Sequence, residues 1–122
     1  MRRANSTQRG YDSRWSAAAA RWREYNPCCC GCLAIGVRRE ATVVDHVVPH
    51  AGDQVLFWDA ASNWQSACEW HHNSIKPMLE RQWRAGKIPA SALRLDSKQA
   101  VALTRARHRP AVGVDGLAIP GT

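Results

Sequence analysis

The 122-residue sequence lacks any apolar run that approaches the length of a membrane span, which takes about 20 residues. It also lacks the apolar core of a signal peptide, because residues 4–10, which follow the basic start, are polar. No internal repeat is present, and no low-complexity linker separates a second domain. From these absences we expect a single soluble domain in the cytoplasm with no membrane partner. Disulfide bonds, which persist in oxidising compartments, are not expected.

Five cysteines are present, and four of them are crowded into one short stretch. A chain of this size buries a limited share of its surface, so an additional stabilising link, such as a disulfide or a structural metal, is expected. Because disulfides are not expected, metal binding is the better interpretation. The spacings Cys29-x-x-Cys32 and Cys68-x-x-His71 are those of a zinc site, and Gly31 provides the open backbone that a tight turn needs.

The predicted zinc is structural, because four protein ligands leave no open coordination position for chemistry. The choice of cysteines is open at this point, since Cys28 or Cys30 could replace Cys29 in a shifted register. Five free thiols without a metal are the alternative, which so dense a cluster disfavours.

The net charge of +7 is unevenly distributed. Residues 1–24 hold six arginines against two acids, residues 25–75 hold two arginines against five acids, and residues 76–109 hold nine basic residues against two acids. A polyanion across the basic flanks, with a divalent cation in the acidic middle, would suit this distribution. A solvated basic surface without a partner explains it equally well.

A helix is expected to begin near Asp12 or Ser13, both good N-cap residues, and to run to Glu24 before Pro27 stops it. Trp15 and Trp22 are seven residues apart and therefore share a face of this helix. Core packing is the preferred interpretation of these tryptophans over the stacking of nucleic-acid bases.

A second signal is the β-branched run 42–44, which predicts a short strand. This strand would deliver Asp45 and His46 to opposite faces, because side chains alternate along a strand. Asn63 follows in a turn-rich segment, and His72 lies at the start of a plausible helix. The expected order is strand, hairpin, helix.

With these residues the sequence resembles the HNH endonucleases, and in particular their small phage-encoded branch. The letters of the motif fall on His46, Asn63 and His72, and the similarity covers roughly residues 9–76. One departure is His71, where the family usually carries a cysteine. Matching phrases include Asn26-Pro27, Cys29-x-x-Cys32-Leu-Ala, Val43-Val-Asp-His-Val-Val-Pro-His50, Gly52-Asp53, Phe57-Trp58-Asp59 and Asn63-Trp-Gln-Ser66.

The resemblance implies an α+β fold with a small ββα-metal core, a zinc-knuckle staple and flanking helices. It implies a DNA endonuclease, and it implies that Asn63 holds the loop that carries the catalytic base. Phage proteins of this kind often act beside the terminase during genome packaging. The large terminase subunit is therefore an expected partner, and the host cytoplasm the expected location.

Hydrolysis of a phosphodiester requires that water be deprotonated and that charge on the phosphate and on the departing 3′-oxygen be stabilised. A neutral imidazole suits the first task, so His46 is the predicted general base. A hard divalent ion suits the other two. Asp45 and His72 are its predicted ligands, because Mg²⁺ keeps several waters and needs few protein groups. Mn²⁺ is the other expected ion, and the imidazole would also accept Ni²⁺ or Zn²⁺.

DNA contacts are predicted for four basic residues. Lys76 lies one helical turn beyond His72 on the same face and is expected to meet the scissile phosphate. Arg14, Arg21 and Arg105 are expected to contact the DNA backbone.

Beyond Pro77 the sequence predicts short helices over 78–84 and 98–107, which a linker at 88–91 joins. The predicted organisation is a disordered basic arm at 1–10, a nuclease domain at 11–109 with its core at 27–77, and an extended tail at 110–122.

Two alternatives to the predicted phage-type endonuclease are a zinc-stabilised DNA-binding module without nuclease activity and a restriction or homing-type HNH nuclease. The intact set Asp45, His46, Asn63 and His72 favours the enzyme over the binding module.

Overall fold

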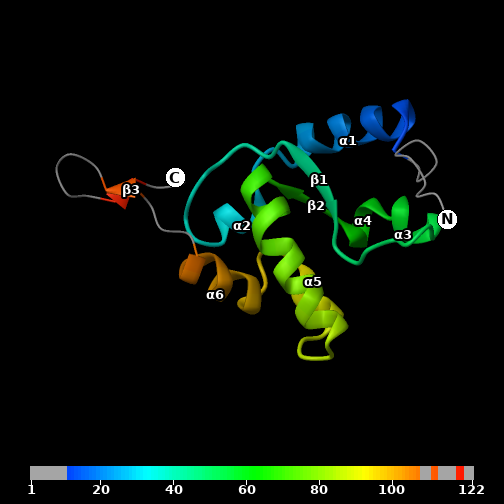
Figure 1. The fold of residues 1–122 in the computed structure, drawn as a ribbon. Helices are drawn as coiled ribbons and strands as arrows, with labels where there is room; N and C mark the ends of the chain where they lie inside the picture. The colour runs from blue at the N-terminus through cyan, green and yellow to red at the C-terminus, as the bar shows by residue number, and fades with distance from the viewer. Residues whose placement is uncertain (1–10, 108–110, 113–117, 120–122) are drawn as a thin grey trace.

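The structure is a computed structural model that describes residues 11–107, 111–112 and 118–119. The predicted arm at 1–10 lies outside the described residues, as does most of the predicted tail. Helices surround a small sheet formed by β1 and β2 (Figure 1), so the described chain is a mixed helix-and-strand structure. The elements of residues 11–67 are α1 (Ser13–Tyr25), α2 (Cys30–Leu33), β1 (Val43–His46), α3 (Gln54–Phe57), α4 (Ala60–Asn63) and β2 (Trp64–Ala67).

The remaining elements follow β2 in the sequence. They are the π-helix η1 (His71–Ile75), α5 (Lys76–Arg84), the 3₁₀-helix η2 (Ala90–Leu93), α6 (Lys98–Arg107), β3 (Ala111–Val112) and β4 (Ala118–Ile119). The two helices expected beyond Pro77 are confirmed as α5 and α6. The expected linker at 88–91 is only partly irregular, because η2 begins within it. In the described part of the tail, β3 pairs with β4 in antiparallel fashion.

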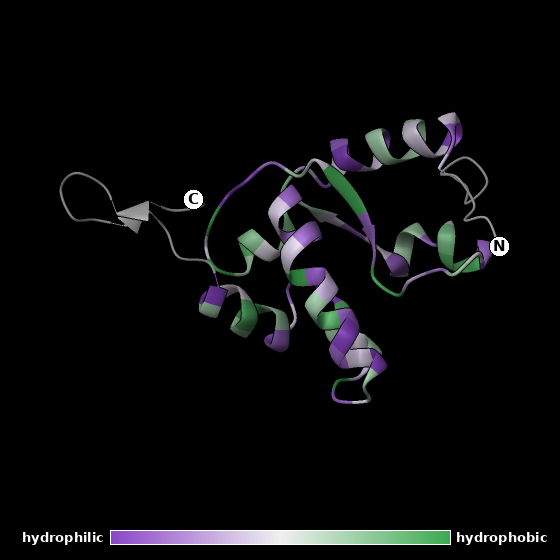
Figure 2. Cartoon of the chain, in the orientation of Figure 1, coloured by the Kyte–Doolittle hydropathy of each residue, from purple (hydrophilic) through white to green (hydrophobic). Residues whose placement is uncertain are grey.

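Strands β1 and β2 are antiparallel, with Asp45 opposite Gln65 and His46 opposite Trp64. The predicted strand is confirmed with shifted bounds, because β1 begins at Val43 and includes Asp45 and His46; its hydrophobic start and hydrophilic end are visible in Figure 2. The connection between the strands is folded into α3 and α4, which begin after the capping residues Asp53 and Asp59. Asn63 is consequently the last residue of a helical turn and not part of an open hairpin loop.

Helix α1 begins as expected, because the Asp12 side chain accepts a hydrogen bond of 3.1 Å from the backbone N–H of Trp15. The helix lies against β1, where Trp15 is buried and the half-buried Trp22 packs beside it. Core packing of both tryptophans is thereby confirmed. The buried members of this aromatic core are Trp15, Ala19, Val44, Phe57 and Trp64.

A second core lies between η1, α5 and α6. Helix α5 ends before Gly86, whose φ of +73° is readily adopted by glycine. Helix α6 begins after Ser97, whose hydroxyl accepts a hydrogen bond of 3.0 Å from the N–H of Ala100. The buried members of this core are Val47, Ala67, Ile75, Leu79, Leu93, Leu95 and Ala100. Among the described residues, no helix combines the length and the apolar character that crossing a membrane requires.

Candidate functional site

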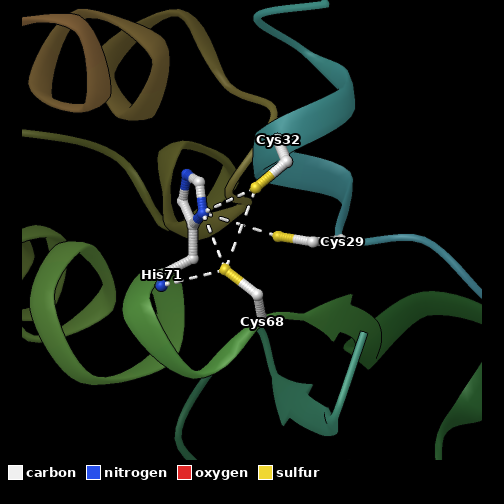
Figure 3. A group of neighbouring side chains, drawn as sticks. All are labelled: Cys29, Cys32, Cys68 and His71. Atoms are coloured by element: carbon white, nitrogen blue, oxygen red, sulfur yellow. Dashed lines mark hydrogen bonds between the residues drawn. The ribbon is translucent and has the colours of Figure 1, made fainter. Parts of the chain in front are cut away.

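Four buried side chains converge at one point (Figure 3). Cys29 directly precedes α2, Cys32 lies within α2, Cys68 directly follows β2, and His71 is the first residue of η1. The Nδ1 atom of His71 lies 3.5 Å from the Sγ atoms of Cys29 and Cys32 and 3.4 Å from that of Cys68. The Sγ atoms of Cys32 and Cys68 are 3.8 Å apart. Tetrahedral ligands at ordinary Zn–S and Zn–N lengths are separated by about 3.8 Å for two sulfurs and about 3.5 Å for sulfur and nitrogen. The predicted Cys3His cluster could therefore hold a structural metal such as zinc.

The imidazole of His71 is oriented by a residue that sequence analysis did not single out. Its Nε2 atom lies 3.2 Å from the Thr104 hydroxyl, which donates its own proton to the Ala100 carbonyl at 2.8 Å. Nε2 must therefore carry the hydrogen and donate it to Thr104, which leaves the Nδ1 lone pair for a metal. Such outer partners fix the ring and tautomer of metal-binding histidines. Thr104 was missed because its partner lies 33 positions earlier in the sequence.

Gly31 is required by the His71 ring and not by a left-handed turn, because its φ is not positive. A Cβ atom at this position would lie 2.4 Å from Cδ2 and 2.5 Å from Nε2 of His71. The glycine therefore allows α2 to approach the ring closely, which replaces the expectation that a tight turn requires it.

Gly31→Ala is expected to displace His71 from the cluster, because the methyl group and the ring cannot occupy the same space. Overpacking of this kind costs about 1–3 kcal/mol. Zinc retention against a competing chelator and the thermal unfolding temperature would both fall. Leu33→Ala, on the exposed side of α2, is the matched control. Equal zinc retention in the two variants would contradict the assigned role.

Cys28 and Cys30 lie outside the cluster. The backbone of Cys28 forms a β-bridge with Glu40, whereas the Cys30 thiol donates to Oε1 of Gln65 at 3.5 Å. Burial is the main cause that raises the pKa of Cys30 to about 12, so this thiol keeps its proton at neutral pH. The cluster geometry thus favours Cys29 over the two alternatives that the sequence left open.

A second polar group is centred on Asp45, a buried residue near the end of β1. Its Oδ1 atom lies 3.0 Å from Nδ1 of His72, and its Oδ2 atom accepts hydrogen bonds from Gln65 at 2.8 Å and from Lys76 at 2.9 Å. Burial by itself would raise the pKa of Asp45, but the hydrogen bond with His72 and the charge of Lys76 outweigh burial and lower it. Asp45 is therefore ionised at neutral pH.

The adjacent residues His71 and His72 face different groups, as expected from their assignment to two different metal sites. His71 points to the thiols, and His72 contacts Asp45. The N–H of Lys76 bonds to the carbonyl of His71, which is the wider spacing of a π-helix. Single π turns occur frequently at functional sites. The hydrogen bond with Asp45 is the main cause that raises the pKa of His72.

His46 is buried among aromatic rings. The Trp15 ring stacks on it with centroids 4.9 Å apart and planes at 25°, and the Phe57 ring lies 4.8 Å away. Its Nε2 atom lies 2.9 Å from the carbonyl oxygen of Phe57, so Nε2 carries the hydrogen and Nδ1 carries the lone pair. Desolvation lowers the pKa of His46 below its usual value. The imidazole is therefore neutral at neutral pH and can accept a proton on Nδ1.

Asn63 joins three backbone groups of the connection between the strands. Its Oδ1 atom accepts from the N–H of Val48 at 2.8 Å, and its Nδ2 atom donates to the carbonyls of Val48 at 3.0 Å and Leu56 at 3.1 Å. Val48 is two positions beyond His46. The amide thus makes the type of contact that was expected of it, to the backbone that follows His46.

Lys76 does not lie at the surface, where a phosphate contact was predicted. Its side chain is 2% exposed, and its ammonium group lies 2.6 Å from the carbonyl of His46, 2.9 Å from Asp45 and 3.2 Å from Glu80. An ammonium group has three protons, and these three acceptors account for all of them. The predicted phosphate contact is corrected to an internal bridge between the end of β1 and α5.

The other three residues predicted to contact DNA are exposed: Arg14, Arg21 and Arg105. Arg14 lies over the Trp58 ring at 5.7 Å and 3.8 Å from a carboxylate oxygen of Asp12. Their contact with DNA stays a prediction. His108 and Arg109, which follow Arg107 in the sequence, lie outside the described residues.

Asp45, His46 and His72 line one open cleft of about 750 Å³. Tyr11 and Trp15 form another part of its wall, so α1 contributes to the site as well as to the core. The Tyr11 hydroxyl lies 3.0 Å from Nε2 of His50, which also lines the cleft. These N-terminal aromatics could not be connected with the site from the sequence, because nothing in the local pattern of α1 indicates which strand it covers.

Comparisons of this chain with protein-family models, with curated proteins and with solved structures gave no match. Similarity in sequence or fold therefore assigns no family to the chain.

Proposed function

We propose that this protein is a metal-dependent DNA endonuclease of the HNH type, which hydrolyses phosphodiester bonds and leaves a 5′-phosphate. The observation that carries the proposal is the arrangement of His46. A neutral imidazole with a lone pair on Nδ1 lines the same cleft as the buried carboxylate Asp45 and its partner His72. The order strand, connection, strand, helix supports the ββα-metal core that the motif implies.

Asp45 and His72 fit a divalent ion. Two neighbouring ligands of an octahedral ion at about 2.1 Å are about 3 Å apart, and Oδ1 of Asp45 lies 3.0 Å from Nδ1 of His72. These two atoms would hold Mg²⁺ or Mn²⁺, with Ni²⁺ or Zn²⁺ as possible substitutes because one ligand is an imidazole. The ion would supply Lewis acidity to the phosphoryl and leaving oxygens.

His46 would remove the proton from the attacking water. A general base must be unprotonated at the working pH, and the lowered pKa of His46 meets this requirement. The Phe57 carbonyl holds the tautomer that leaves Nδ1 free to accept the proton. Asn63 would hold the connection between the strands through Val48, so its role is orientation.

We also propose that the Cys3His cluster holds zinc and that its role is structural. Four ligands complete a tetrahedral shell and leave no position for substrate. The arginines at the surface of α1 and α6 would contact the DNA backbone. By resemblance to the phage HNH branch, the large terminase subunit is the partner that we propose, and the host cytoplasm the location.

The test is cleavage of a supercoiled plasmid by the zinc-loaded protein in EDTA or with added Mg²⁺, Mn²⁺ or Ni²⁺. Cleavage is expected only with added ion, with 5′-phosphate at the new ends. His72→Ala removes one of two proposed ligands and is expected to lower the rate at least about 10-fold, as loss of a metal contact typically does. Asn73→Ala, at the exposed neighbouring position, is the control and should keep the wild-type rate.

Each outcome has a distinct meaning. If no ion supports cleavage although the zinc-loaded protein binds DNA, the chain is a zinc-stabilised binding module and the proposal of an enzyme fails. If cleavage occurs but His72→Ala matches Asn73→Ala, the enzyme stands and His72 is not a ligand. Site-dependent cutting would favour a restriction or homing-type nuclease.

A further inference from the structure

Gln65 is a buried amide on β2 whose hydrogen-bonding groups are all engaged. Its Nε2 atom donates to Oδ2 of Asp45 at 2.8 Å and to the carbonyl of Leu93 at 3.3 Å. Its Oε1 atom accepts from the N–H of Leu95 at 2.9 Å and from the thiol of Cys30 at 3.5 Å. The side chain therefore joins β1, α2 and the segment before α6.

The orientation of this amide follows from its backbone partners. A backbone N–H only donates and a carbonyl only accepts, so the oxygen must face Leu95 and the nitrogen must face Leu93. Cys30 supports the same orientation, because its thiol donates to the same Oε1 atom at 3.5 Å. The N–H that faces Asp45 is thus held in place by groups outside the cleft.

Within the described part of the chain, the carboxylate of Asp45 is consequently hydrogen-bonded to internal donors through only one of its two oxygens. Its Oδ2 atom accepts from both Gln65 and Lys76, whereas its Oδ1 atom faces His72. We propose that Gln65 is a positioning residue of the catalytic metal site, which occupies Oδ2 so that Asp45 offers Oδ1 to the ion. This inference rests on the proposed function, and it goes further by assigning a role to a residue outside the four proposed catalytic and metal-binding groups.

The sheet register explains why position 65 can do this. Gln65 lies directly opposite Asp45, and side chains of such a pair extend from the same face of the two strands. The next residue, Ser66, points to the other face, where its hydroxyl donates to the Asn26 carbonyl. Cys30, which the zinc cluster leaves unused, thereby also receives a role as a donor to the amide.

The test compares Gln65→Leu with Ser66→Ala in the zinc-loaded protein. Both variants remove a buried polar side chain from β2, but only the first removes a contact with Asp45. The readout is the affinity for Mn²⁺, measured by electron paramagnetic resonance of free Mn²⁺ without DNA. Loss of an outer partner of a metal ligand typically costs 10–100-fold in affinity, and this loss is expected for Gln65→Leu. Ser66→Ala should stay within about 3-fold of the wild type.

A second measurement uses the wild-type protein, because Gln65→Leu leaves buried groups without partners and its folding must be checked by zinc content and circular dichroism. The side-chain amide protons of Gln65 are followed by NMR during addition of Mg²⁺. They are expected to shift together with the Asp45 backbone amide, because Asp45 joins them to the ion. The exposed side-chain amide of Gln54 serves as the internal control and should not shift.

Equal Mn²⁺ affinity of Gln65→Leu and Ser66→Ala would overturn the inference while leaving the nuclease proposal intact. A Gln65 amide that does not respond to Mg²⁺, although Asp45 does, would overturn it as well. A wild-type protein that binds neither ion beyond its zinc would defeat the proposed catalytic site, and the role of Gln65 would fall with it.

Discussion

Removal of zinc from the Cys3His cluster is expected to unfold the protein. Apparent binding energies of structural zinc are about 10–16 kcal/mol in small zinc-binding peptides, whereas whole domains are stable by only about 5–15 kcal/mol. The cluster joins α2 to η1, and Thr104 of α6 holds its imidazole. Loss of the metal would therefore release three elements at once and leave buried thiols and an imidazole without their shared partner.

The measurement is circular dichroism and zinc content during titration with a strong chelator. We expect helical signal to disappear as zinc is withdrawn and to return when zinc is added. Cys29→Ser is expected to reproduce the metal-free state, because it removes one of the four ligands. Cys28→Ser is the matched control, since Cys28 lies outside the cluster and should retain zinc and fold.

Two outcomes would count against this prediction. Zinc loss in Cys28→Ser but not in Cys29→Ser would mean that the ligands follow the shifted register. A metal-free protein that retains its cooperative thermal transition would mean that the two hydrophobic cores stabilise the fold by themselves and that folding does not depend on zinc binding at the cluster.

Replacement of His46 by alanine is expected to lower the rate of DNA cleavage by about 10²–10⁴-fold, the usual contribution of a general base. Three observations single out this residue. It lines the cleft, its tautomer is set by the Phe57 carbonyl, and desolvation lowers its pKa. Because the base must be neutral, the rate should fall as the pH drops, and the decline should begin below the usual pKa of about 6.5.

His50→Ala is the matched control for His46→Ala. The two imidazoles lie 5.0 Å apart between ring centroids and line the same cleft. His50, however, contacts Tyr11 and the N–H of Gly52 through its two ring nitrogens. We expect His50→Ala to lose less than about 10-fold in rate, well below the loss of about 10²–10⁴-fold expected for a general base. Zinc content and DNA affinity should be unchanged in both variants.

A larger loss in His50→Ala than in His46→Ala would transfer the role of base to His50. Equal large losses together with a lower unfolding temperature would indicate damage to the aromatic core around Trp15 and Phe57. In that case His46→Gln, which keeps a polar group near the Phe57 carbonyl, should still fail to cleave DNA if His46 is the base.

The local sequence determined the elements on which the sites are built. Asp12 capped α1, the β-branched run became β1, and Gly86 ended α5. These features depend on backbone preferences and on groups within a few positions of one another, so local patterns predict them. The spacing of these residues likewise predicted the Cys3His cluster, because Cys-x-x-Cys and Cys-x-x-His each bring two side chains together within one turn.

Tertiary structure decided how those elements face one another. It buried Lys76 against Asp45 and the His46 carbonyl, where helical periodicity alone had placed it on the open face beside His72. It brought Gly31 against His71, a contact that only the packing of α2 on η1 creates. The partners of such contacts lie 30 or more positions apart in the sequence. Which distant groups meet depends on how the whole core packs, and no local spacing carries that information.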